Sequence, residues 1–148
     1  MSKYSHRANI NAPPPEVWAA MVDVESWPAW ASQFKRLDRL DAGPLALASR
    51  VRVRPKGQLA SVWQVIEYDD GRSFIWASNL MPGLRITGGH VLTPDGDGTT
   101  AEFWLDASGP LGTLLGPVLR RLIFSRNTRS AATGLKTHIE SRARSLVA

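Results

Sequence analysis

The sequence predicts an α+β fold in which an antiparallel sheet of six or seven strands curves around one long C-terminal helix. Two observations support this. Residues 37–107 alternate apolar and polar side chains between tight turns, which is typical of strands. After Gly109-Pro110 the alternation ends, and apolar residues recur at three- and four-residue spacing as far as about Leu146. We expect a single domain over residues 1–148, since this length supports one real core.

The N-terminal part predicts one strand followed by two short helices. Residues Tyr4 to Ile10 alternate loosely and end before a run of prolines. The last of these, Pro15, suits the first turn of a helix over residues 16–22. A second short helix or turn carries residues 25–30, where Pro28 ends regular structure.

The middle of the chain predicts the rest of the sheet. Asp69-Asp70-Gly71 is a hairpin signal because glycine accepts a positive φ, and residues 94–98 form the clearest turn. Short strands between such turns make an antiparallel meander. The expected strands cover residues 37–40, 48–54, 58–68, 73–78, 84–92 and 99–107.

The C-terminal segment predicts a helix with one apolar stripe, which needs a broad apolar surface beneath it. The stripe thins over residues 125–130, which are all polar, and only the flanking residues Phe124 and Ala131 keep an apolar side there. We interpret this as a place where helix and sheet part and leave a cavity of the kind that holds small molecules. The stripe consists of Leu111, Leu115, Val118, Leu122, Leu135, Ile139, Ala143 and Leu146.

Composition limits the classes of function. No apolar run reaches the roughly 18 residues of a membrane span, so we expect no membrane insertion. The absence of cysteine excludes disulfides and thiolate metal sites, and together with the lack of a signal peptide it indicates the cytoplasm. The net charge of +5 could attract nucleic acid, but Arg50, Arg52 and Arg54 alternate with valines like the wet face of a strand. We therefore expect no nucleic-acid partner, and no histidine spacing indicates a metal or cofactor.

Five segments in this order resemble the polyketide cyclase/dehydrase family of the START-like (SRPBCC, helix-grip) superfamily, over nearly the whole chain. The resemblance implies a helix-grip fold and a hydrophobic or aromatic ligand, and some members cyclise and dehydrate polyketide chains. The segments are Trp27-Pro28-Ala29-Trp30, Trp63-Gln64-Val65-Ile66-Glu67, Phe74-Ile75-Trp76, residues 90–99, and Gly109-Pro110-Leu111-Gly112 before an arginine-rich helix.

Tryptophan is abundant, with six residues, and the flat indole can stack on a ring system as well as fill a core. Trp27 and Trp30 flank a proline break and are candidates for the cavity mouth. Strand alternation groups Trp63 with Val65 and Glu67 on one face, and Trp76 with Phe74 on another. Packing in the core is the simpler explanation for each tryptophan, and a surface salt bridge is the more ordinary explanation for Glu67.

His90 is the candidate proton shuttle, in phase with Ile86 on its strand, because a neutral imidazole serves as a general acid or base. A histidine buried beneath the helix explains the same position equally well. We place Phe103 on the apolar side of the last strand and Phe124 on the helix. Asn127 and Thr128 are expected to reach the cavity as hydrogen-bond donors to a ligand.

The sequence thus favours a protein, monomeric or homodimeric, that binds a small hydrophobic or aromatic, polyketide-like molecule between sheet and helix. Whether it also cyclises or dehydrates that molecule stays open. The alternatives are a carrier or sensor without turnover, and an interaction domain whose basic helix meets an acidic partner.

Overall fold

The computed structural model describes residues 3–147, with side chains described as far as Arg142. Its sheet has seven antiparallel strands in the order β1-β7-β6-β5-β4-β3-β2, so only β1 pairs with a strand distant in sequence. The predicted antiparallel sheet is confirmed. The strands are β1 (Tyr4–Ile10), β2 (Phe34–Arg39), β3 (Arg50–Pro55), β4 (Ser61–Asp69), β5 (Ser73–Met81), β6 (Leu84–Asp95) and β7 (Gly98–Ser108).

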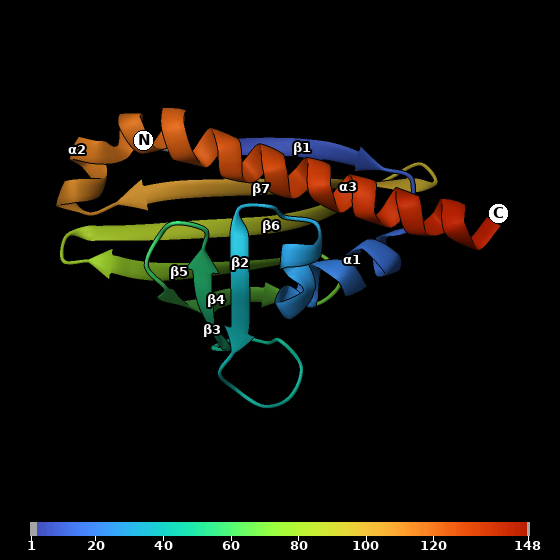
Figure 1. Cartoon of the computed structure of the whole chain (residues 1–148), viewed down its shortest axis with the longest axis horizontal. Helices are drawn as coiled ribbons and strands as arrows, with labels where there is room; N and C mark the ends of the chain where they lie inside the picture. Colours follow the sequence, from blue (N-terminus) through green and yellow to red (C-terminus); the bar gives the residue numbers. More distant parts are fainter. Residues whose placement is uncertain (1–2, 148) are drawn as a thin grey trace.

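The helices lie on one face of the sheet, which we call the inner face (Figure 1). Helix α1 (Pro14–Val22) and the 3-10 helix η1 (Val24–Ala29) follow β1, as predicted. The C-terminal helix has three parts, α2 (Pro110–Leu119), a π-helical segment η2 (Arg120–Phe124) and α3 (Ser125–Val147). Helix α3 runs along β1 and β7, while η1 packs against β2.

The strand register places aromatic side chains in rows across the inner face. Phe74 on β5, His90 on β6 and Phe103 on β7 stand opposite one another. The next row holds Trp76 and Gly88 in the same register. Directly opposed side chains on one face interact, so each row packs as a unit.

Gly88 and Gly89 make room for two tryptophans on opposite faces of β6. A Cβ atom on Gly88 would lie 3.0 Å from Nε1 of Trp76 on the inner face. A Cβ atom on Gly89 would lie 2.0 Å from the ring of Trp104 on the outer face. The pair therefore permits an indole over each side of the strand, and β6 continues through it without a bulge.

The predicted apolar stripe is wrong for α2 and right for the part of α3 whose side chains are described. Leu135 and Ile139 are fully buried, but Leu115, Val118 and Leu122 are exposed. The reason is that α2 rests on β7 through small residues, since Gly112 is buried against Ala107. Ala143 and Leu146 lie outside the described side chains.

None of the helices within residues 3–147 combines the length and the apolar composition that crossing a membrane requires.

Candidate functional site

An aromatic cluster occupies the inner face between the sheet and η1. His90 lies at its centre, with ring centroids of Phe74 at 4.1 Å and of Trp27 and Trp76 both at 5.2 Å. Trp27 is anchored because its Nε1 donates to the carbonyl of Met21 at 3.0 Å. The structure therefore brings together most of the sequence-predicted pocket residues. This group comprises Trp27, Trp30, Trp63, Val65, Trp76, His90 and Phe103, joined by Trp18, Phe34, Phe74 and Tyr68.

His90 is held as a neutral imidazole in this cluster. Its Nδ1 lies 3.1 Å from the carbonyl oxygen of Phe74, which can only accept, so Nδ1 carries the proton. Burial lowers the pKa of His90 to about 3, and the bond to Phe74 offsets that shift only in part. The remaining nitrogen, Nε2, is thus a hydrogen-bond acceptor and a weak base. The proton-shuttle role stays a prediction.

The bulge in β4 separates Glu67 from the other predicted residues. Val65 pairs with Trp76 on the inner face, but the register shifts before Glu67, which pairs with Ile75. The extra residue reverses the alternation, so Tyr68 turns inward to Trp18 and Glu67 is exposed. Trp63 remains half-buried, with its ring 5.7 Å from that of Trp76.

Four predicted residues lie towards α2 and along the C-terminal helix. Ile86 and Phe124 are buried together with Leu84 in a second, smaller core cluster. Thr128 is buried, and its hydroxyl donates to the carbonyl of Phe124 at 2.8 Å within the same helix. Asn127 is half-buried, and its backbone carbonyl accepts from Nε2 of Gln33 at 3.1 Å.

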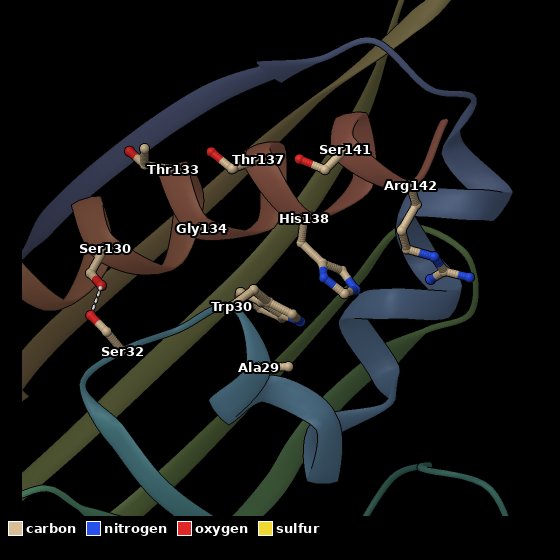
Figure 2. A pocket seen from close by; sticks show the side chains of 10 residues that line it. All are labelled: Ala29, Trp30, Ser32, Ser130, Thr133, Gly134, Thr137, His138, Ser141 and Arg142. Atoms are coloured by element: carbon tan, nitrogen blue, oxygen red, sulfur yellow. Dashed lines mark hydrogen bonds between the residues drawn. The ribbon is translucent and has the colours of Figure 1, made fainter. Parts of the chain in front are cut away.

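A groove of about 790 Å³ lies between η1 and α3, where the predicted mouth residue Trp30 forms part of its wall. The chain after η1 touches α3 directly, because a Cβ on Gly134 would lie 1.8 Å from the carbonyl oxygen of Trp30. Figure 2 shows His138 pointing from α3 towards Trp30 and η1, with Arg142 one turn further along. The lining residues are Ala29, Trp30, Ser32, Ser130, Thr133, Gly134, Thr137, His138, Ser141 and Arg142.

The groove combines an aromatic wall with cationic and hydroxyl groups. Burial and, to a smaller extent, the nearby Arg142 guanidinium lower the pKa of His138. Protonation of His138 is therefore disfavoured beside the charge of Arg142. An anion bound between His138 and Arg142 would raise the pKa of His138 again, because it would stabilise the protonated imidazole. Figure 2 shows the hydroxyls of Thr133 and Thr137 on the side of α3 that is turned away from Trp30.

Sequence reasoning missed most of this groove. The sequence pattern indicates a surface position for His138 and assigns no role to the other lining residues of α3. A usable signal exists in the four-residue spacing of Thr133, Thr137 and Ser141, which places three hydroxyls on one helix face. A second row at the same spacing holds Ser130, Gly134, His138 and Arg142.

Among the described residues, no group of three or more His, Asp or Glu side chains lies close enough together to hold a metal ion.

The architecture is a START-like, helix-grip fold, in which a curved antiparallel sheet holds a long C-terminal helix. A START superfamily protein from Mycobacterium smegmatis superposes with a TM-score of 0.77 at 18% identity, over 95% of this chain and 98% of that chain. A protein from Thermus thermophilus gives a TM-score of 0.75 at 21% identity, over 95% and 98% of the two chains. At such identities the likeness shows the fold alone.

The chain belongs to the polyketide cyclase/dehydrase family. Residues 1–140 match the family described as "Polyketide cyclase / dehydrase and lipid transport". The di-domain ARO/CYC protein StfQ of the steffimycin biosynthetic pathway has the same fold, with a TM-score of 0.75 at 15% identity. The alignment covers 96% of this chain and 51% of StfQ. Comparison with curated protein sequences finds no match.

Proposed function

We propose that this protein binds a small, mainly apolar molecule with aromatic character between the sheet and the C-terminal helix, and that the groove beside Trp30 is the entrance. Membership of the family and the START-like fold support hydrophobic ligand binding in general. The position of Trp30 carries the finer proposal, because this one side chain belongs both to the groove and to the aromatic cluster.

The rings form a continuous path from the groove into the interior. Trp30 lies 5.5 Å from Trp27, and Trp27 lies 5.2 Å from both Trp76 and His90, measured between ring centroids. Aromatic faces stabilise a ring system by stacking and by burying apolar area. A ligand that displaces the Trp30 indole would therefore meet further aromatic surface rather than backbone polar groups.

The rim of the groove favours a ligand with a polar or acidic end. Arg142 and His138 lie on α3 above Trp30. A carboxylate or phenolate placed there would gain charge-assisted hydrogen bonds. The ligand class is therefore an aromatic or polyketide-like molecule with its apolar body towards Trp30 and its acidic end towards Arg142.

The protein could also catalyse a reaction of the bound ligand. Nε2 of His90 can accept a hydrogen bond from a ligand hydroxyl inside the cluster, which would orient a chain for cyclisation or dehydration. The low pKa of His90, about 3, favours this orienting role over proton transfer near neutral pH. Without turnover, the same site would serve a carrier or a sensor.

Two fluorescent probes test the proposal, anilinonaphthalene sulfonate and the uncharged phenylnaphthylamine, which share the same ring system. We expect both to bind the native protein. Replacing Trp30→Leu should weaken both about tenfold, because both lose the aromatic wall. Arg142→Gln should weaken only the sulfonate, also about tenfold, because only that probe carries the anion.

Arg54→Gln provides the matched control, since Arg54 is exposed on β3 and does not line the groove. Circular dichroism establishes that each variant keeps its fold. Unchanged binding of both probes to Trp30→Leu would contradict the proposal that ligands enter through the groove. Equal losses of affinity for both probes in Arg142→Gln would contradict the proposal that Arg142 binds an acidic group of the ligand, and the apolar site alone would stand.

A further inference from the structure

Helix α2 and segment η2 carry an apolar surface that faces solvent. The exposed fractions are 72% for Leu114, 38% for Leu115, 56% for Val118, 60% for Leu122 and 36% for Ile123. We call these five residues the α2 patch. Single exposed apolar residues are ordinary on protein surfaces, but a contiguous group on one helix marks a site of interaction.

The α2 patch is not a core surface that failed to find a partner within the chain. The buried residues of α2 are the glycines Gly112 and Gly116, and Leu111 and Leu119 are half-buried against the smaller core cluster. A Cβ on Gly112 would lie 3.0 Å from the backbone carbon of Ala107, so the helix sits on β7 at close range. An ordinary surface helix buries most of its large apolar residues. In α2, Leu111 and Leu119 are half-buried, but Leu114, Leu115 and Val118 are exposed.

The turn between β5 and β6 extends the apolar surface at the same end of the molecule (Figure 1). Leu80 and Met81, the last two residues of β5 before this turn, expose 43% and 49% of their surface. The turn is joined to the start of α2, because the amide of Leu111 donates to the carbonyl of Gly83 at 2.9 Å. Helix α2 and the turn therefore lie next to each other at one end of the molecule.

Positive charge surrounds this edge. Arg120, Arg121 and Arg126 lie beside or within the patch, and Arg129 follows one turn later. No aspartate or glutamate occurs from Ala107 to Ile139 in the sequence. A helix with exposed leucines and flanking arginines has the properties that place a helix in the interface of an anionic membrane.

We propose that the α2 patch docks on the surface of an anionic lipid bilayer. A bilayer supplies an apolar layer for the leucines and negative headgroups for the arginines within one helix diameter. A second copy of the chain fits less well. Two patches face to face would bring Arg120 and Arg121 of both copies together, with no acidic side chain on the segment to neutralise them. The proposal concerns a surface separate from the ligand groove.

Vesicle co-sedimentation tests this with phosphatidylcholine alone and with about one quarter phosphatidylglycerol. We expect binding only to the anionic vesicles, and loss of binding at about 0.5 M salt because screening weakens the charge contacts. Leu114→Gln with Leu122→Gln should weaken binding at least tenfold, on the order of two buried leucines. Arg120→Gln with Arg121→Gln should weaken it about thirtyfold.

The matched controls remove exposed leucine and arginine side chains that lie outside the α2 patch. Leu59→Gln removes a leucine that is 93% exposed in the loop between β3 and β4. Arg52→Gln with Arg54→Gln removes two exposed arginines from β3. Both controls should bind anionic vesicles as the native protein does.

Three outcomes would overturn the docking proposal. They are equal binding to both vesicle types, native binding by the Leu114/Leu122 variant, and a dimer in sedimentation velocity that this variant dissociates. The last would assign the patch to a second copy. Probe binding at the groove should be unchanged in all α2 variants, so failure here and failure of the ligand proposal give different results.

Discussion

The two ends of the inner face are built on opposite plans. At the aromatic end, under η1 and α3, large rings from the sheet and from η1 contact one another and are nearly all buried. At the α2 end, only Leu84, Ile86, Ala107 and Phe124 form a buried cluster among the described residues, while Leu114 and Leu115 of α2 face solvent. The first end uses its apolar residues for internal packing. The second leaves several of them exposed to solvent.

Within the C-terminal helix, the residues that stabilise the fold and the residues available for contact with a partner therefore lie in different parts. The same C-terminal segment is a core element in α3 and an exposed apolar element in α2, and the π-helical η2 lies at the transition. A π-segment changes the angular position of the residues that follow it, so the apolar faces before and after it need not align. Substitutions at the aromatic end should therefore unfold the protein, and those at the α2 end should not.

The largest expected effect follows from Gly134→Ala at the aromatic end. The new Cβ would lie 1.8 Å from the Trp30 carbonyl oxygen, so either α3 or the chain after η1 must move. We expect a loss of about 3 kcal/mol or more in the free energy of unfolding, measured with urea. Thr133→Ala, one residue earlier and exposed, should change it by less than about 0.5 kcal/mol. Native stability of Gly134→Ala would contradict the close contact between α3 and Trp30.

A smaller effect, dependent on pH, should come from His90. Burial lowers its pKa from 6.5 to about 3, so between these values the unfolded chain binds a proton that the folded chain does not. Stability must therefore fall as pH falls through this window. At about pH 4.5 this one group should lower the free energy of unfolding by about 2–3 kcal/mol relative to about pH 7.5.

His90→Gln isolates this contribution, because glutamine can donate to the Phe74 carbonyl but does not titrate in this range. Urea unfolding at both pH values should show a smaller acid loss in the variant. His138→Gln should retain most of the native pH dependence, since His138 is only half-buried. Equal pH dependence in His90→Gln and the native protein would contradict the neutral, buried state of His90.

The fold was predictable from the sequence because its signals are local. The turn at Asp69-Asp70-Gly71 and the alternation around it fix a hairpin with little help from distant contacts. Every strand of the meander has such a signal, so a sheet of six or seven strands follows from the sequence. The β4 bulge has none, because one extra residue leaves the composition of the strand unchanged. That is why simple alternation places Glu67 on the inner face.

The candidate site was predictable only in its aromatic part. Large rings such as Trp76 and His90 stand out in a strand pattern, and the register brings them together. The groove depends on the direct contact of Gly134 with Trp30, two residues far apart in the sequence. Small hydroxyl residues carry no strong hydrophobic period, so the stripe of Thr133, Thr137 and Ser141 gives no signal in an analysis of apolar spacing.

The smallest expected effect belongs to the α2 end and completes the contrast. Leu114→Ala and Leu122→Ala should each change the free energy of unfolding by less than about 0.5 kcal/mol, because both side chains are mostly exposed. Leu135→Ala, in the fully buried part of α3, should cost about 2–5 kcal/mol in the same urea experiment. A large loss from either α2 substitution would mean that these leucines support the core. Small losses would show that these exposed leucines contribute little to folding, as the proposed docking role requires.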